Sequence, residues 1–205
     1  MKPREVWAAF KEKFLAIFGF ISGVISGLVL TRQQMERYKK EARTDFLTGA
    51  LNPRGLKEAL AYECERAQRF GRAFSILMTD LDHFKEANDR FGHGAGDIIL
   101  KEFVRLVREE IRAIDTIARK GGDEFILILP ETKSEGGQIL AERLREKIDG
   151  YEFRFPRGKS FSRITLSVGI ATFPDQAKSA EALLNAVDEA VYQAKEERNK
   201  VVVFG

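Results

Sequence analysis

From residue 53 onward, stretches with apolar residues at every third or fourth position alternate with short runs that are almost continuously apolar. The first pattern is typical of helices that bury one face, and the second of strands buried in a sheet. This mixture predicts an α+β fold with a central, mostly antiparallel sheet and helices on its faces. The expected helices span residues 53–70, 84–113, 133–149 and 179–197, and the expected strands 73–80, 162–172 and 201–204, with a hairpin at 116–130.

The longest predicted helix, 84–113, has the clearest apolar stripe. Its apolar residues recur at helical spacing, so we expect them to face the core of the domain. The stripe consists of Ile99, Phe103, Leu106, Val107, Ile111 and Ile114.

A different apolar segment lies near the N-terminus, where the 17 residues 14–30 carry no charge. As a helix it would be about 26 Å long, enough for a thin hydrocarbon core. No small-residue cleavage pattern follows it, which disfavours a cleaved signal peptide; a helix lying on the membrane surface is the alternative. We therefore expect a tail (1–13), a transmembrane helix (14–31), a helical linker (32–43) and one domain (44–205).

Charge separates the same two parts of the chain. Residues 1–43 hold nine Lys and Arg against four Asp and Glu, and the remainder holds 25 against 27. A domain so close to neutrality lacks the basic surface of a nucleic-acid-binding protein, so we expect no nucleic-acid partner. The basic excess beside an apolar segment favours a membrane. Cys64 is the only cysteine, which excludes a disulfide framework and a cysteine-based metal site.

Small residues are regularly spaced within the apolar segment. Gly19, Gly23 and Gly27 recur every four residues, a pattern that lets two membrane helices approach closely. Glycine is frequent in membrane helices in any case, so the stripe is a weak signal by itself. A short seam of three- and four-residue spacings continues it to residue 42. We expect this region to pair two copies of the chain and raise the local concentration of their domains.

Two glycines and two acids, Gly121, Gly122, Asp123 and Glu124, immediately precede a continuously apolar run. The glycine pair predicts a tight hairpin turn, and the run predicts a buried strand. Such a turn can bring the backbone close to a ligand and present carboxylates at its tip, an arrangement suited to a metal-held phosphate. The alternative is an ordinary hairpin whose acids are solvated.

An apolar strand ends at Asp80, and helix-forming residues follow soon after. Strand ends beside helix N-termini are common phosphate sites, where a carboxylate is useful when a cation bridges it to phosphate. Asp80 and Asp123 together therefore predict a Mg²⁺ site with oxygen ligands. For Asp82 the alternative of a helix N-cap is equally open.

At these residues the sequence resembles the GGDEF family of diguanylate cyclases, which condense two GTP into cyclic di-GMP. The resemblance covers about residues 44 to 205, and several segments follow one another in the family's order. They are Thr44–Arg54, Asp80–Asp89, Phe91–Asp97, the signature Gly121–Phe125, and Leu166–Ala171.

The resemblance implies a role for each matching residue. Asp80, Asp123 and the carbonyl of Leu81 would hold Mg²⁺, two ions per active site, with Mn²⁺ as a possible substitute. Asn88 and Asp97 would hydrogen-bond guanine, whose N1–H and amino group suit a carboxylate. The substrate's phosphates would meet Lys85, the backbone N–H groups of His83 and Phe84, and the backbone at Gly121 and Gly122.

The implied reaction is attack of one GTP's 3′-hydroxyl on the α-phosphate of the other, which depends mostly on alignment and charge neutralisation. Asp123 or Glu124 could help to deprotonate the hydroxyl; the sequence does not decide between them. We interpret His93 as part of a helix-entry turn. Because each site holds one GTP, a homodimer is required.

Arg112 and Asp115 match the spacing of the family's RxxD inhibitory site, which binds the product cyclic di-GMP. Arg119 could join them, since guanidinium groups bind phosphate and stack on guanine. The alternative is an arginine at a helix end with an exposed ion-pair partner.

One departure from the family lies near the C-terminus. The family usually places a Lys and an Arg four residues apart, with a Gly between them, and both reach the phosphates. Here Lys195 and Arg198 are three apart and the Gly is missing. Arg198 must then approach from a shifted helix end, or leave its role to Lys200.

Together these features predict a membrane-anchored, product-inhibited diguanylate cyclase of the bacterial inner membrane, with its domain in the cytoplasm where GTP is present. The alternatives are a GGDEF domain that no longer catalyses and acts as a receptor for cyclic di-GMP or GTP, and a cyclase of altered base choice. Asp97 disfavours the last.

Overall fold

The structure is a computed structural model that describes Gln34 and residues 43–205. The predicted tail, the transmembrane helix and nearly all of the linker lie outside the described residues, so these assignments stay predictions. None of the helices in the described part of the chain is long and apolar enough to cross a membrane. The domain that follows occupies the unit Arg43–Gly205.

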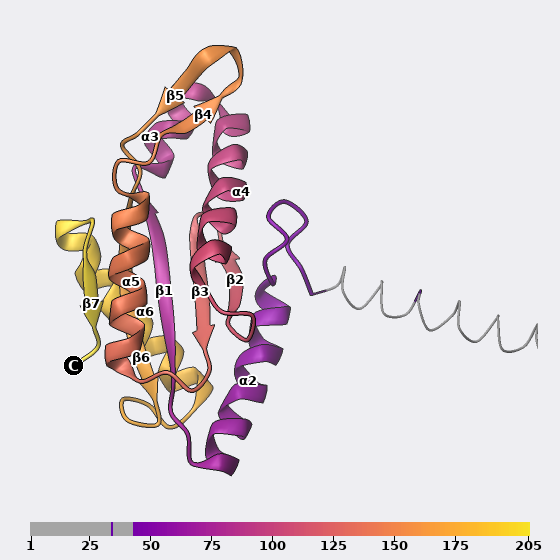
Figure 1. Ribbon diagram of the computed structural model, residues 1–205, viewed down its shortest axis with the longest axis vertical. Coiled ribbons are helices and arrows are strands. Elements are labelled where there is room, and N and C mark those ends of the chain that lie inside the picture. Colours follow the sequence, from indigo (N-terminus) through magenta and orange to yellow (C-terminus); the bar gives the residue numbers. More distant parts are fainter. Residues whose placement is uncertain (1–33, 35–42) are drawn as a thin grey trace, which may run out of the picture. The chain divides into compact units, whose positions relative to one another are not determined.

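A five-stranded sheet in the order β2-β3-β1-β6-β7 forms the centre of the domain (Figure 1). All neighbouring strands are antiparallel except β6 and β7, which are parallel. The predicted α+β fold with a mostly antiparallel sheet is therefore confirmed. The sheet strands are β1 (Phe74–Asp82), β2 (Thr116–Gly121), β3 (Glu124–Leu129), β6 (Thr165–Phe173) and β7 (Val201–Val203).

Helices cover both faces of this sheet because side chains of its central strand alternate between them. On one face, Ile76 and Met78 of β1 pack in the core formed with α2 (Pro53–Phe70) and α6 (Ala180–Glu197). On the other, Leu77 and Leu81 pack in the core formed with α4 (His93–Glu110) and α5 (Ser134–Ile148). The central strand is thus buried on both sides, and only its end is free to carry polar function.

The predicted helix 84–113 is wrong as a single element. It is divided into α3 (Phe84–Phe91) and α4 by Gly92, whose φ of 84° and ψ of 164° are incompatible with a helix. Most of the predicted stripe is buried, including Ile99 and Phe103, but Ile114 lies beyond the end of α4 and is 56% exposed. Its assignment to the core was wrong because the helix ends four residues earlier.

A second, two-stranded sheet was not expected from the sequence. It consists of β4 (Phe153–Phe155) and β5 (Lys159–Phe161), joined by the short 3₁₀ turn η1 (Pro156–Gly158). Phe155 and Phe161 both pack against Phe91 at the end of α3. The centroid of the Phe91 ring lies 5.1 Å from that of Phe155 and 5.8 Å from that of Phe161. The following strand, β6, consequently begins at Thr165, three residues later than predicted.

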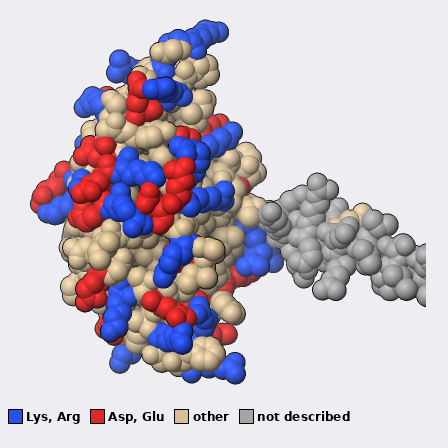
Figure 2. Space-filling view, viewed as in Figure 1, with Lys and Arg blue, Asp and Glu red and all other residues tan. Residues whose placement is uncertain are grey.

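Charged residues of both signs are intermixed on the face shown in Figure 2, which includes α4 and α5. Many of them are ion-paired across these two helices: Glu110 of α4 pairs with Arg143 and Lys147 of α5, each at 2.6 Å. Ion pairs on the protein surface, such as these, each contribute little to the stability of the fold. They leave no large surface of a single charge on this face.

Candidate active site

Two carboxylates meet at the end of the central strand. Asp80 of β1 lies opposite Glu124 in the β1–β3 register, so the turn that precedes Glu124 brings Asp123 next to it. The turn needs glycine at Gly122, whose φ is +51°. Burial raises the pKa of the Asp123 carboxyl, and the neighbouring charge of Asp80 raises it further. The predicted tight hairpin and the proximity of these two acids are both present.

This pair fits a divalent cation. A cation between the two carboxylates would relieve the repulsion that raises the pKa of Asp123, and carboxylate oxygens are the ligands that Mg²⁺ prefers. Within residues 43–205, no group of three or more His, Cys, Asp or Glu side chains is arranged to hold a metal. The donor set therefore suits an ion that takes its remaining ligands from water, a backbone carbonyl such as that of Leu81, and substrate phosphate.

Lys195, from the last turn of α6, is brought to the same place. Its ammonium contacts Asp80 and lies 2.8 Å from Oδ1 of Asp82. Burial alone would lower the pKa of Lys195, but its hydrogen bonds to Asp80 and Asp82 outweigh this effect and raise the pKa. Lys195 is consequently a fixed positive charge beside the candidate metal ligands, consistent with its predicted role in binding phosphate.

Asp82 is neither a helix N-cap nor a free carboxylate. The N-cap of α3 is His83, which has a φ of 63° and no side-chain capping bond, and the Asp82 side chain is fully buried. Burial alone would raise the pKa of Asp82, yet hydrogen bonds from Lys195 and from the backbone N–H of Asn199 hold it below its usual value. The N-cap interpretation is wrong because the strand extends to Asp82 and points this carboxylate inward.

The first turn of α3 begins directly after the candidate metal ligands. Its leading N–H groups, from Phe84 and Lys85 onward, have no acceptor within the helix, and the side chain of the N-cap residue His83 does not cap them. Free N–H groups at a helix N-terminus favour an anion such as phosphate. The Lys85 side chain is exposed. The backbone of His83 and Phe84 thus follows Asp80 within a few residues, at an end of α3 that suits an anion, and the phosphate-binding role of Lys85 stays a prediction.

Asn88 has an unsatisfied hydrogen-bonding atom. Among the described residues, its Oδ1 is buried and has no hydrogen-bond partner. The atom is accommodated by Gly96 of α4, where a Cβ would lie only 2.1 Å from it. Buried polar atoms without a partner are rare and indicate an absent ligand or water. Asp97, the other residue predicted to bind guanine, follows Gly96 directly and is exposed.

The end of α6 explains the shortened spacing after Lys195. Arg198 has a φ of 60° and a ψ of 172°, a conformation that favours glycine, so it occupies the backbone position expected of the family's missing Gly. No contact of its exposed side chain with Asp80, Asp123 or Lys195 is present among the described residues. Lys200, the alternative cation, pairs with Glu197 at 2.5 Å. The phosphate-binding role of Arg198 stays a prediction.

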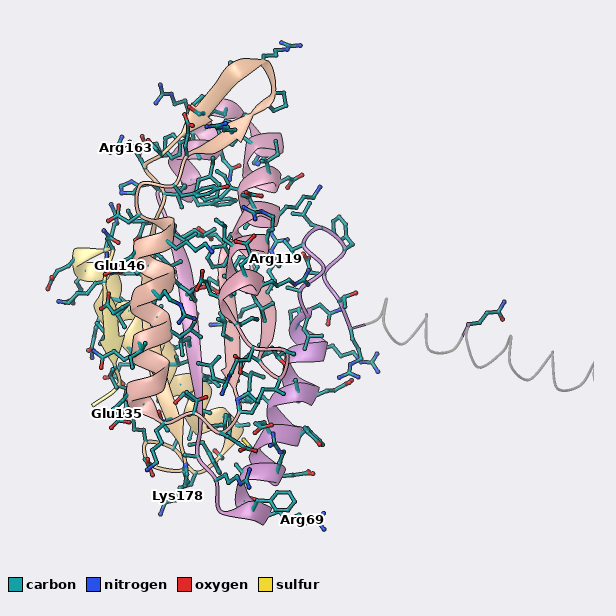
Figure 3. The ribbon with its side chains drawn as sticks, in the orientation of Figure 1. Arg69, Arg119, Glu135, Glu146, Arg163 and Lys178 are labelled. Carbon is teal, nitrogen blue, oxygen red and sulfur yellow. The ribbon has the colours of Figure 1, made fainter. Side chains whose placement is uncertain are left out.

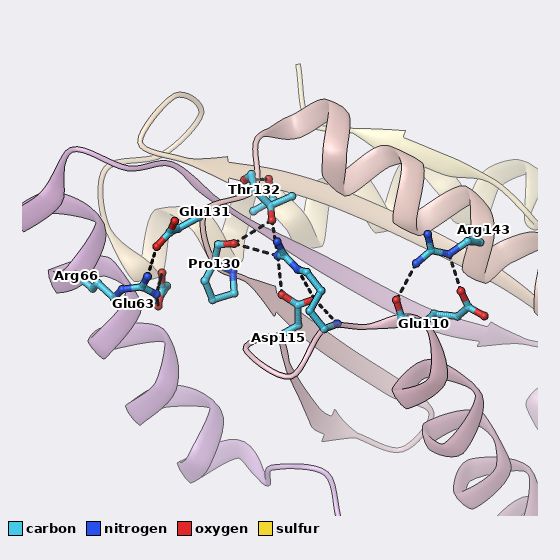
Figure 4. A network of polar contacts seen from close by, with 10 residues as sticks. Glu63, Arg66, Glu110, Asp115, Pro130, Glu131, Thr132 and Arg143 are labelled. Carbon is cyan, nitrogen blue, oxygen red and sulfur yellow. Dashed lines mark hydrogen bonds and ion pairs between the residues drawn. The ribbon is translucent and has the colours of Figure 1, made fainter.

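Arg112 and Asp115, the residues predicted for the inhibitory site, pair with each other (Figure 4), and their binding of product stays a prediction. Arg112 donates from Nε and Nη2 to both carboxylate oxygens of Asp115, at 3.1 and 2.7 Å, and also reaches the Pro130 carbonyl and Thr132. The Asp115 side chain is 2% exposed and that of Arg112 53%. An open cavity of about 530 Å³ is lined by Arg112, Asp115 and Arg108. A planar, exposed guanidinium held over a cavity can bind phosphate or stack on a base.

Arg119 does not join this pair. It extends from β2 towards the loop that precedes α2 (Figure 3), where its Nη1 lies 3.3 Å from both carboxylate oxygens of Asp45. Its Nη2 also donates to the carbonyl of Gly122 at 2.7 Å. Arg119 thus connects the domain's first turn to the glycine hairpin, and its predicted contact with product stays a prediction.

Several residues at this site were missed by sequence reasoning. Thr165 and Ser167 of β6 donate to Asp82 at 2.8 and 2.9 Å, and Asn199 donates through its backbone N–H at 3.0 Å. A usable signal was present for β6, where polar Thr165 and Ser167 alternate with apolar residues inside an otherwise buried strand. No sequence signal could have shown the contact from Asn199.

A hairpin that carries Asp123 next to Asp80, with a lysine from the last helix beside them, gives this α+β domain a cluster of charges that suits a cation and phosphate. The model of the diguanylate cyclase GGDEF domain matches residues 42–200. The chain therefore belongs to the GGDEF family.

Individual relatives agree with this assignment. The response regulator PleD of Caulobacter vibrioides is 36% identical over 190 residues, covering 87% of this chain and 42% of PleD. The diguanylate cyclase DgcP of Pseudomonas aeruginosa is 42% identical over 161 residues, covering 78% of this chain and 24% of DgcP. The chain thus spans less than half the length of these relatives.

A solved structure shows the same fold. The GGDEF domain of TpbB (YfiN) from Pseudomonas aeruginosa superposes with a TM-score of 0.75 at 32% identity, covering 79% of this chain and 94% of that domain. The similarity extends over nearly the whole of the solved domain.

Proposed function

We propose that this protein is a diguanylate cyclase that condenses two GTP into cyclic di-GMP and releases two pyrophosphates. The observation that carries the proposal is the convergence of Asp80, Asp123 and Lys195 at the end of β1, beside the free N-terminus of α3. That arrangement suits a metal-bound triphosphate, and we infer the particular reaction from membership of the GGDEF family.

In this reaction the 3′-hydroxyl of one GTP attacks the α-phosphate of the other. Asp80, Asp123 and the Leu81 carbonyl would hold Mg²⁺, or Mn²⁺ in its place. The metal supplies charge neutralisation and activation of the hydroxyl when it is bound. Lys195 and Lys85 bring positive charge to the triphosphate, whose charge spreads as pyrophosphate leaves.

Glu124 lies opposite Asp80 and next to Asp123, so either acid of the turn can accept a proton from the attacking hydroxyl. Burial and the neighbouring charge of Asp80 raise the pKa of Asp123, which favours its action as a proton acceptor before metal binds. Asn88 and Asp97 would select guanine over the other bases by hydrogen-bonding to it. The unpartnered Oδ1 of Asn88 would accept from the guanine edge, where adenine offers a different pattern of donors.

Catalysis requires two domains, because each site holds one GTP and the two substrates must face each other. A homodimer is therefore part of the proposal, together with feedback by cyclic di-GMP at Arg112 and Asp115. The product would have to compete with Asp115 for the Arg112 guanidinium, since these two groups are already bonded. The apolar segment 14–31 would anchor the dimer in the bacterial inner membrane, with the domain in the cytoplasm.

The test is product formation from GTP and Mg²⁺ by the full chain in detergent, with Asp123→Ala as the control. Cyclic di-GMP from the parent and none from the variant is the expected result. A plateau before GTP is consumed, relieved by Arg112→Ala, would support product inhibition. No product from the parent would overturn the proposal.

The second candidate, a receptor for cyclic di-GMP or GTP, is favoured by one observation. The end of α6 holds Arg198 where glycine is expected, with its side chain exposed and outside the cluster around Asp80. A parent that makes no product but binds cyclic di-GMP tightly would establish this function in place of catalysis.

A further inference from the structure

The fully buried carboxylate of Asp82 is surrounded by hydrogen-bond donors, and no function assigned above explains them. Oδ1 accepts from Ser167 and Lys195, and Oδ2 accepts from Thr165 and Asn199, at distances of 2.8 to 3.0 Å. Ser167 also reaches Oδ2 at 3.1 Å. These donors occupy both oxygens of a carboxylate with about four acceptor sites. Asp82 is therefore unable to bind a metal or a substrate directly.

One of these donors is a side chain of the candidate active site. The Lys195 ammonium, which has three N–H groups, is shared between Asp80 at the metal site and Asp82 beneath it. If Asp80 binds a metal ion instead of Lys195, Asp82 still holds the Lys195 ammonium. The Asp82 carboxylate is buried, so water cannot replace the ammonium as its hydrogen-bond donor. The third N–H of Lys195 stays available for a phosphate oxygen.

A second donor fixes the end of α6. The backbone N–H of Asn199 binds Asp82, while the Asn199 side chain binds Arg145 of α5 and Asp149, the residue that follows this helix. Asn199 and Arg198 are consecutive residues with positive φ, at 44° and 60°. Asparagine tolerates a positive φ, but the conformation of Arg198 is unfavourable for a residue other than glycine and persists only when its surroundings hold it. Asp82 is therefore one of the groups that keep the shortened end of α6 in place.

We propose that Asp82 is a positioning residue for nucleotide binding: it touches no substrate, but holds the Lys195 ammonium and the end of α6 where the triphosphate is bound. The inference rests on the proposed function only in requiring that this site binds a guanine nucleotide. It does not require that the bound nucleotide reacts.

The experiment measures binding of α,β-methylene GTP, which cannot release pyrophosphate, to the full chain in detergent with Mg²⁺ by calorimetry. Asp82→Asn is compared with Lys195→Met and with the double variant. We expect each single variant to weaken binding about tenfold or more, and the double variant to bind no worse than Lys195→Met alone. Residues that act through one another are non-additive in this way.

Two further variants separate positioning from stability. Ser75→Ala removes a buried hydroxyl from the same strand, where it bonds Thr132 and Thr172 away from the site, so it should lower the melting temperature without changing nucleotide affinity. Ser167→Ala keeps the Asp82 charge and removes one donor, so it should weaken binding a few-fold even if Asp82→Asn does not fold.

The outcomes distinguish the two proposals. Unchanged binding in Asp82→Asn, or in Ser167→Ala where Asp82→Asn fails to fold, overturns the positioning role alone, as do fully additive losses in the double variant. A parent that binds no nucleotide overturns both the positioning role and the proposed function. Binding of the analogue with the expected non-additivity, by a parent that makes no cyclic di-GMP from GTP, supports the positioning role and overturns only the cyclase.

Discussion

At the scale of single residues, Asp123 combines a functional position with an unfavourable charge. Its pKa is raised because the carboxyl is partly buried and lies beside Asp80, so its ionised form destabilises the metal-free fold. Asp123→Asn should therefore raise the free energy of unfolding on the order of 1 kcal/mol in metal-free buffer, while abolishing activity. The measurement is thermal unfolding of parent and variant at pH 7 with a chelator present.

The pH dependence of this effect has a definite sign. A carboxyl whose pKa is higher in the folded than in the unfolded state costs stability as pH rises through that interval, and the cost is constant above it. The advantage of Asp123→Asn should thus grow from about pH 4, the ordinary Asp pKa, until the raised folded pKa is passed. Asp89→Asn, at an exposed acid of α3, is the control. A variant no more stable than the parent at pH 7 would contradict the interpretation.

Gly96 tests the guanine-binding role of Asn88 without touching either hydrogen-bonding residue. A Cβ there would meet Asn88 Oδ1 at 2.1 Å, so Gly96→Ala should turn the Asn88 side chain aside. Loss of one or two hydrogen bonds to guanine predicts about a tenfold rise in KM for GTP, with kcat less affected. Gly94→Ala, in the same turn of α4 but with no atom within 4 Å of its Cβ, should leave KM unchanged. Equal KM values in the two variants would exclude this role.

At the scale of elements, the break between α3 and α4 determines how Asn88 and Asp97 approach each other. It depends on Gly92, whose φ and ψ are accessible to few other residues. Gly92→Ala should cost roughly 1–3 kcal/mol of stability and also raise KM for GTP, because the two helices are no longer joined at the same angle. Thermal unfolding and steady-state kinetics measure the two effects.

Gly71, the C-cap of α2, provides the matched control. It also has a positive φ, 63°, but lies at the far end of α2, and its ψ of 32° belongs to the left-handed region that other residues can enter. Gly71→Ala should cost less stability than Gly92→Ala and leave KM unchanged. The role of the break would be refuted by a Gly92→Ala variant that loses stability but keeps the parental KM.

The elements that were predicted correctly are those whose signal is local. Helix α2 begins at Pro53 after the cap Asn52 and ends at Phe70 before the C-cap Gly71, so its predicted span of 53–70 is confirmed. The β4–β5 hairpin was missed because strands of three residues carry little alternation, and its stability comes from the packing of Phe155 and Phe161 on the distant Phe91. The candidate site followed the same rule: the proximity of Asp80 and Asp123 was predicted from a strand end and a turn, and the structure shows the two acids as neighbours.

The surroundings of those residues could not be predicted in the same way. Asp82 is held by groups 83 to 117 residues further along the chain, and only the tertiary fold brings them together. The break at Gly92 was readable in principle, since glycine interrupts helices, but the helix-forming residues on both sides of it favoured one long helix.

At the scale of the whole molecule, the proposed reaction depends on the encounter of two domains. If residues 1–43 pair two chains, the effective concentration of one domain near its partner is set by that tether and not by the bulk protein concentration. The specific activity of the full chain should then be constant down to nanomolar protein, whereas that of residues 44–205 alone should fall as the protein is diluted.

The comparison requires that the shortened protein retain an intact site. Its specific activity should approach that of the full chain at high micromolar protein, where domains meet by diffusion, and its melting temperature should match that of the full chain's domain. Arg112→Ala in both proteins removes product inhibition as a confounding cause of early plateaus. Equal specific activities at nanomolar protein would mean that the contacts pairing the domains lie within residues 44–205, and that the small-residue stripe at Gly19, Gly23 and Gly27 has no part in catalysis.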